Sequence, residues 1–327
     1  MNDGHPIVWT ISDGKAGMDV QAIGVARALG VEPLVKHIAP KGIFKSLAPW
    51  GPVAPAERFG QPGSLFAPPW PTLAIATGRQ SIPYIKRLKR CAGNNTVTIV
   101  LQDPRTKTGI ADFVWVPEHD RLRGPNVFTT LTAPSSFTAN ALARLRSRIP
   151  ESIERLPAPR VAVFLGGDNA VYRYTPSDCA RLIEILESFG ALAASFLITP
   201  SRRTSKGMTD AVDLATNPYP RLLWNGDGAN PYADFLAHAD VIVVTADSIN
   251  MVSEACASGV PVFVFHPSGG SSKFAYFHEQ LEKRGLTRPL RAPLDSIETW
   301  AYDPLFAATE IAAEVQRRWP ELLPACP

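Results

Sequence analysis

The chain has 327 residues, of which 33 are lysine or arginine and 30 are aspartate or glutamate, so its formal net charge is +3. Apolar residues make up 45% of it and charged residues 19%, which excludes an intrinsically disordered chain. The small net charge excludes a protein that binds polyanions through charge alone, so nucleic acid is not an expected partner. At about 150 residues per domain, the length indicates two domains.

The four cysteines show no zinc-finger spacing, which is typical of free thiols in a reducing compartment. No apolar run approaches the ~20 residues that a bilayer crossing needs. The N-terminus has no basic segment followed by a long apolar one, as a secretory signal would. We therefore expect a cytoplasmic protein without metal or cofactor, and peripheral contact with the inner face of the membrane stays open.

Short apolar runs alternate with helical periods in the first half, which indicates a parallel sheet covered by helices. Strands are predicted over residues 7–11, 73–77, 96–101 and 113–116, and a helix over 20–29. Residues 39–71 hold eight prolines, so we expect an irregular surface excursion there.

The pattern restarts after a proline-bracketed stretch at residues 146–159. Strands are predicted over residues 161–165, 194–199, 241–245 and 260–265, and a last helix over 305–319. The sequence thus predicts an α/β protein with two Rossmann-like domains facing a cleft. Their expected limits are 1–145 and 155–300, with 301–327 forming a helix that packs back on the first domain.

Polar clusters follow three strands of the second half, at the strand ends where open parallel sheets bind ligands. They comprise Gly166, Gly167, Asp168 and Asn169; Ser201, Arg202, Arg203 and Thr204; and Asp247, Ser248 and Asn250. The glycines would let the backbone approach a phosphate, and the arginines would bind one bidentately. A tight turn and a solvated basic loop are the plain alternatives.

Ser248 can cap a helix whose first amides bind an anion, and Glu254 lies six residues further along. A carboxylate there can accept two hydrogen bonds from a vicinal diol such as ribose. Spacing alone is equally compatible with a capping serine and a solvated glutamate.

A glycine-containing loop, SDGKAG at residues 12–17, opens the first predicted helix. It matches neither a Walker loop nor a dinucleotide fingerprint. It suits an acceptor pocket with Asp13 as general base, although a turn aspartate that caps the helix is the alternative. His119 is the second candidate base, against a solvated loop histidine. The acceptor side would include Gly14, Lys15, Gly17, Gly78 and Arg79.

Residues 245–264 (TADSINMVSEACASGVPVFV) resemble the donor-site helix of two-domain GT-B glycosyltransferases. The likeness is strongest to the enzymes that add N-acetylglucosamine to the peptidoglycan lipid intermediate. It implies that Glu254 binds the donor ribose, and that Ser248 and the backbone near Asn250 and Met251 face the diphosphate or sugar.

Nearly the whole chain resembles the mitochondrial-fission ELM-type family, some of whose bacterial members are linked to lipopolysaccharide core assembly. The matching stretches are WTISDGKAG at 9–17 with Gln21, ATGR at 76–79, QDPR at 102–105, PEHD at 117–120, SRRT at 201–204 and the 247–254 block. One departure is LTAP at 131–134, where the family pattern has glycine. The resemblance implies a GT-B glycosyltransferase, and the family name by itself establishes no fission role.

These observations favour a metal-independent glycosyltransferase that moves a sugar from a nucleoside diphosphate, preferably UDP, to a glycan or lipid-linked acceptor in cell-envelope polysaccharide assembly. Arg202, Arg203 and Lys273 are the candidate cations that neutralise the leaving diphosphate. One alternative is a nucleotide-sugar 2-epimerase on the same fold. Another is an inactive, membrane-associated binding protein that contacts lipid or a partner through the aromatic residues of segment 43–70. The plain alternative for this segment is a loop packed on the first domain.

Overall fold

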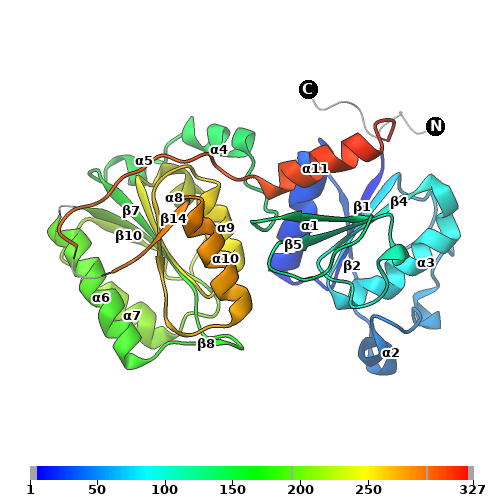
Figure 1. Cartoon of the computed structure of the whole chain (residues 1–327), viewed down its shortest axis with the longest axis horizontal. Helices are drawn as coiled ribbons and strands as arrows, with labels where there is room; N and C mark the ends of the chain where they lie inside the picture. Colours follow the sequence, from blue (N-terminus) through cyan, green and yellow to red (C-terminus); the bar gives the residue numbers. More distant parts are fainter. Residues whose placement is uncertain (1–5, 193, 292–293, 323–327) are drawn as a thin grey trace. The chain divides into compact units, whose positions relative to one another are not determined.

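The computed structural model describes residues 6–192, 194–291 and 294–322, which form two compact units. Unit 1 holds the residues up to Thr138 together with those from Phe306 on, and unit 2 runs from Ala139 to Leu305 (Figure 1). No helix in these ranges is long and apolar enough to cross a membrane.

Unit 1 is built on a parallel six-stranded sheet in the order β2-β1-β3-β4-β5-β6. The strands are β1 Val8–Ser12, β2 Leu34–His37, β3 Leu73–Thr77, β4 Val97–Leu101, β5 Phe113–Pro117 and β6 Val127–Thr130. The helices are α1 Ala16–Ala28, α2 Gly42–Leu47, α3 Ile82–Ala92 and α11 Ala307–Arg318. Every residue of β1, β3, β4 and β5 is buried, as expected for strands covered on both faces.

Unit 2 repeats this architecture with the parallel order β10-β9-β7-β11-β12-β14. Its strands are β7 Arg160–Leu165, β9 Ser195–Pro200, β10 Arg221–Leu223, β11 Val241–Thr245, β12 Val262–Phe265 and β14 Thr287–Pro289, with a small antiparallel pair, β8 Tyr172–Arg173 and β13 Ser268–Gly269. Its helices are α4 Ala139–Arg146, α5 Glu151–Glu154, α6 Pro176–Ala191, α7 Lys206–Thr216, α8 Tyr232–His238, α9 Ile249–Cys256 and α10 Ser272–Lys283.

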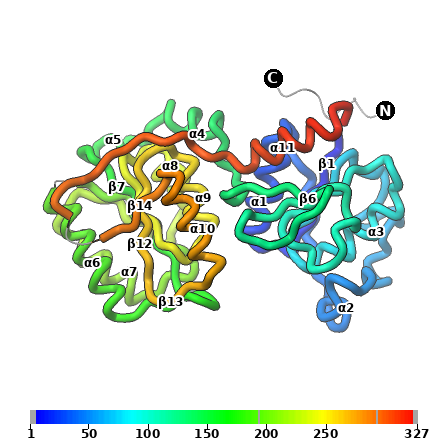
Figure 2. The backbone as a smooth tube through the Cα atoms, viewed as in Figure 1, coloured from blue at the N-terminus to red at the C-terminus, as the bar shows by residue number. Residues whose placement is uncertain are grey.

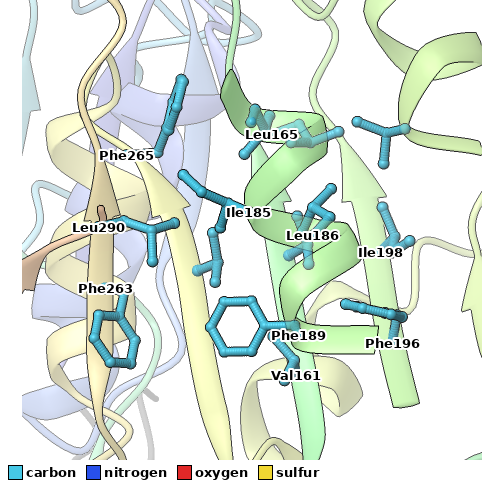
Figure 3. Close-up of a cluster of buried hydrophobic side chains, with 14 of the residues drawn as sticks. Val161, Leu165, Ile185, Leu186, Phe189, Phe196, Ile198, Phe263, Phe265 and Leu290 are labelled. Atoms are coloured by element: carbon cyan, nitrogen blue, oxygen red, sulfur yellow. The ribbon is translucent and has the colours of Figure 1, made fainter. Parts of the chain in front are cut away.

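One hydrophobic cluster of unit 2 lies between its sheet and the helices α6 and α7. Figure 3 shows Ile185, Leu186 and Phe189 of α6 among buried side chains of the strands, such as Phe263 of β12. A reciprocal capping box fixes the start of α6, because Thr175 and Asp178 each accept a hydrogen bond from the other's backbone N–H.

The division between the units differs from the expected limits of 145 and 155. α4 belongs to unit 2, where it packs on α8 and the Arg146 guanidinium donates to the carbonyls of Ala237 and Ser258. At the other end, the Tyr302 hydroxyl donates to the Val260 carbonyl, 3.0 Å away, which keeps residues 301–305 in unit 2. Only α11 returns to unit 1, where it packs against α1 and β6 (Figure 1).

The sequence missed several short elements, among them β2, β6, β10 and β14. The excursion at residues 39–71 also holds one short helix, α2. Phe59 and Trp70 of this segment pack beside Phe66, which is fully buried and lies 6.0 Å from Trp9 between ring centroids. The plain alternative of a packed loop is therefore correct for these three aromatic residues.

Candidate functional site

Each sheet has one point where the strand order reverses, and the crevice beyond the carboxyl ends of those two strands is where ligands bind in such sheets. In unit 2 this point lies between β7 and β11, because β9 and β10 continue on one side and β12 and β14 on the other. The three polar clusters of the sequence follow β7, β9 and β11. The structure therefore brings all three to one edge of the sheet.

Asp247 joins the three clusters. Its side chain is fully buried, and Oδ2 accepts from the Gly167 N–H at 3.0 Å and forms an ion pair with Arg203 at 2.8 Å. Oδ1 accepts from the hydroxyls of Tyr174 and Thr245, both 2.7 Å away. Four donors fill the lone pairs of a carboxylate, so the protein itself occupies this side chain. It raises the pKa of Tyr174, on top of the larger effect of burial.

Gly166 and Gly167 are explained by close packing around Asp247. A Cβ atom on Gly166 would lie 2.1 Å from Oδ1 of Asp247, and one on Gly167 would lie 2.0 Å from the Arg203 carbonyl oxygen. The two N–H groups are also used internally, by Thr245 at 2.7 Å and by Asp247. In this structure the glycines thus close a tight turn and do not offer free amides to a phosphate.

The neighbouring positions shape the same loop. Asn169 accepts from the N–H groups of Val171 and Tyr172, and its amide donates to the Asp247 carbonyl at 3.0 Å. Asp168 is exposed and accepts from the Tyr174 N–H at 2.9 Å. These contacts make the loop after β7 a fixed support for the edge of the sheet.

Two arginines after β9 differ in their availability. Arg203 is 39% exposed and committed to Asp247, whereas Arg202 is exposed and makes no hydrogen bond or ion pair within the described ranges. Ser201 and Thr204 fold the turn between them, since the Ser201 N–H donates to the Thr204 hydroxyl at 2.9 Å. Lys273 lies in the first turn of α10, the helix that follows β12 along the chain. Arg202 is therefore the cation that the β9 loop leaves open to an anion.

Glu254 lies in α9, which Ser248 caps by accepting from the Met251 N–H at 3.4 Å. The side chain is nearly buried, at 8% exposure, and Oε2 accepts from the Tyr232 hydroxyl at 2.7 Å. Burial raises the pKa of Glu254 to about 7. Asn250 and Met251 are half-buried in the first turn of the same helix.

Sequence reasoning missed Tyr174 and Tyr232. Tyr232 is the first residue of α8, and its ring lies tilted against that of Phe164, one residue before the end of β7, with the centroids 4.5 Å apart. It lies 22 positions before Glu254 and belongs to no motif, so no local signal pointed to it. Only the packing of α8 against β7 places its hydroxyl beside the carboxyl group.

In unit 1 the strand order reverses between β1 and β3, and the loops carrying Asp13 and Gly78 follow these strands. Lys15 caps α1 through its backbone without a side-chain hydrogen bond, so Asp13 is not a helix cap. Its Oδ2 forms an ion pair with Lys15 at 2.6 Å, while Oδ1 is buried without a hydrogen-bond partner in the residues that the structure describes. The side chain is 11% exposed.

The other predicted acceptor-side residues differ in backbone conformation and exposure. Gly14 and Gly78 have φ values of 75° and 84°, which other residues rarely adopt. Gly17 lies in the first turn of α1, and Arg79 is exposed without a hydrogen bond or ion pair in the described part of the chain. His119 follows β5, and β3 and β4 separate that strand from β1. The structure therefore does not place the two candidate bases on adjacent strands.

A hydrogen-bonded pair of glutamines connects α1 to the loop that follows β4. The Gln102 amide, directly after β4, donates to Oε1 of buried Gln21 in α1 at 2.9 Å. Gln102 also has a positive φ of 76°, a strained conformation that often marks functional loops. Both glutamines lie in stretches on which the family resemblance rests.

Comparisons with known proteins agree with this architecture. The family model described as mitochondrial fission ELM1 matches residues 16–319. Mitochondrial fission protein ELM1 from Arabidopsis thaliana is 26% identical, over 94% of this chain and 90% of its own length.

Solved structures share the fold at low identity. UDP-N-acetylglucosamine 2-epimerase from Rickettsia bellii has a TM-score of 0.53 at 12% identity, over 97% of this chain and 96% of its own. MurG from Acinetobacter baumannii has a TM-score of 0.50 at 14% identity, over 97% and 92%. These likenesses show the fold, which is the two-domain GT-B type.

Proposed function

This chain belongs to the mitochondrial fission ELM1 family, and we propose that it is a glycosyltransferase that takes a sugar from a nucleoside diphosphate, preferably UDP. The observation that carries the proposal is the hydrogen bond from Tyr232 of α8 to buried Glu254. Glu254 lies in α9, the helix that follows β11 at the reversal point of the unit 2 sheet. The UDP-sugar in the name of a relative with this fold supports the choice of donor. The acceptor is a glycan or lipid-linked hydroxyl in cell-envelope polysaccharide assembly.

In this proposal the Glu254 carboxylate accepts hydrogen bonds from the two ribose hydroxyls of the donor. Tyr232 holds Oε2 by its hydroxyl, which fixes the rotamer that the diol meets. The N-terminal amides of α9, near Asn250, face the diphosphate, and Arg202 and Lys273 supply positive charge. Fixed cations and helix amides of this kind stabilise the leaving group, and the reaction then needs no metal.

Asp13 is the proposed general base. Its Oδ1 has no hydrogen-bond partner in the described residues, while Oδ2 forms an ion pair with Lys15. The acceptor hydroxyl gives its proton to Asp13, and its oxygen forms a bond to the anomeric carbon. The bond between that carbon and the diphosphate breaks, and the nucleoside diphosphate leaves with the electron pair.

Calorimetry with UDP tests the donor site. Glu254→Ala is expected to weaken binding by about 1–3 kcal/mol, because the ribose hydroxyls lose their acceptor. The matched control is Glu187→Ala, an exposed glutamate of α6, which is expected to bind UDP as the wild type does. Equal affinity in the wild type and a folded Glu254→Ala variant would remove Glu254 from the site.

Incubation with UDP-N-acetylglucosamine separates the alternatives. Transfer of labelled sugar to a membrane glycan fraction, unchanged by EDTA, supports a metal-independent transferase. Conversion to the 2-epimer without an acceptor supports the epimerase instead. Binding without turnover across the nucleotide sugars and acceptors supports an inactive binding protein.

A further inference from the structure

The excursion at residues 39–71 has an outer part, around α2, in which most large apolar side chains are exposed. No residue of α2 is buried, and Figures 1 and 2 show this helix standing out from the rest of unit 1. Ile43 is 65% exposed, Leu47 44% and Trp50 67%. Three large apolar side chains thus face solvent within eight residues, next to the packed aromatic group of Phe59, Phe66 and Trp70.

The surrounding sequence is strongly basic. Residues 34–92 hold nine lysines and arginines against one acidic residue, Glu57, although the whole chain carries only +3. Glu57 accepts a hydrogen bond from the Tyr84 hydroxyl at 3.0 Å. The positive charge of this chain is therefore concentrated in one segment, which marks an electrostatic docking surface.

A pocket of about 560 Å³ lies between this segment and α3. Arg58, Arg87 and Arg90 line it, and all three are exposed with side chains that make no hydrogen bond or ion pair within the described ranges. Trp50 forms part of the same wall, and Gly51 beside it bonds to the Leu47 carbonyl at 2.9 Å. Unpaired guanidinium groups and exposed apolar side chains therefore meet at one place.

We propose that this face docks on an anionic phospholipid surface. The three arginines bind headgroup phosphates in and around the pocket, a task for which planar guanidinium groups are suited. Ile43, Leu47 and Trp50 enter the interface between headgroups and acyl chains, where tryptophan is enriched. A nucleic acid would match the charge but would leave two aliphatic side chains without an apolar partner. The inference stands independently of the transfer reaction.

Co-sedimentation of the full chain with vesicles tests the proposal. The wild type is expected to bind vesicles of phosphatidylcholine with phosphatidylglycerol, and to bind far less to phosphatidylcholine alone. The triple change Arg58→Gln, Arg87→Gln and Arg90→Gln is expected to weaken binding about 100-fold, since each basic residue contributes about five-fold. Leu47→Ser with Trp50→Ser is expected to weaken it at least ten-fold, at unchanged charge.

Matched changes elsewhere separate a local surface from net charge. Arg144→Gln, Arg148→Gln and Arg155→Gln remove three charges from unit 2, and Leu214→Ser removes an apolar side chain that is 77% exposed. Both controls should bind anionic vesicles as the wild type does, and circular dichroism with urea denaturation would confirm that every variant is folded. If the control triple lost as much vesicle binding as the Arg58, Arg87 and Arg90 triple, the proposal would be overturned. Binding of soluble glycerol phosphate but not of vesicles would overturn it as well.

Discussion

Burial makes Glu254 an unusual carboxyl group, because it raises the pKa to about 7 from the ordinary value of 4.5. Tyr232 acts in the opposite direction by donating a hydrogen bond to the carboxylate. A carboxyl group with a pKa near neutrality is partly protonated at pH 7, whereas a diol requires hydrogen-bond acceptors. Donor binding should therefore be coupled to proton release.

The same shift predicts how stability depends on pH. Between pH 4.5 and about 7, Glu254 ionises more readily in the unfolded chain than in the folded one, so the free energy of unfolding falls as pH rises. Glu254→Gln keeps an acceptor for Tyr232 and removes this term. Urea denaturation should show the wild type losing about 2.5 kcal/mol more than Glu254→Gln between pH 5 and 8. The surface control Glu187→Gln should lose stability with pH as the wild type does. If Glu254→Gln also followed the wild type, the raised pKa of Glu254 would be contradicted.

Asp13→Asn tests the proposed base at the same scale. The amide keeps the shape and the hydrogen-bonding capacity of the side chain but cannot take a proton, so turnover should fall about 10²–10⁴-fold. UDP affinity should survive, because the proposed donor contacts belong to unit 2. Activity close to that of the wild type would remove Asp13 and make His119 the next candidate. Loss of both activity and binding would assign Asp13 a structural role.

The loops after β7, β9 and β11 form one hydrogen-bonded assembly at the scale of elements. Asp247 and Thr204 hold it, the latter with its hydroxyl 2.6 Å from the Gly166 carbonyl oxygen. Gly167 lets the loops after β7 and β9 touch, since any side chain there meets the Arg203 carbonyl. The position of Arg202 therefore depends on a contact between two loops.

Gly167→Ala is expected to lower the free energy of unfolding by about 2–3 kcal/mol, because one of the two loops must move to admit the methyl group. UDP affinity should fall with it if Arg202 binds the diphosphate. Gly207→Ala is the matched control, since a Cβ atom there meets nothing within 4 Å and lies in the first turn of α7. Urea denaturation should show this control unchanged or stabilised by up to about 1 kcal/mol.

At the scale of the whole molecule, the chain forms unit 1, then unit 2, and returns to unit 1 with α11 (Figure 2). The buried residues of α11, such as Ile311 and Val315, lie on the helix face that packs against α1. Unit 2 is continuous, and its core cluster uses only residues of its own range. It should therefore fold without the rest of the chain.

Two fragments test this division. Residues 139–305 contain the buried side chains Leu142 and Ile153, the carbonyl contacts of Arg146 and the Tyr302 hydrogen bond, all of which residues 155–300 lack. The longer fragment should unfold cooperatively in urea. The shorter one should be less stable by about 3 kcal/mol or more, as expected from the loss of two buried aliphatic side chains. Equal stability would place the start of the unit near residue 155.

The sequence by itself predicted the two-fold α/β repeat and the main strands, because apolar runs and turn residues are local signals. It also predicted that the polar clusters follow strands. Because the carboxyl ends of parallel strands lie at the same edge of a sheet, that prediction places all of the clusters at one edge. The resemblance to the ELM-type family was confirmed by the family match.

Contacts between distant positions were decided only by the tertiary structure. Tyr232 reaches Glu254 across 22 positions, and the Gly167 N–H reaches Asp247 across 80, because helices cross over between strands in an order that no local pattern encodes. The same reason explains why the aromatic residues of segment 43–70 divide between the core and the surface. Local composition measures how apolar a side chain is, and the neighbouring elements decide whether anything covers it.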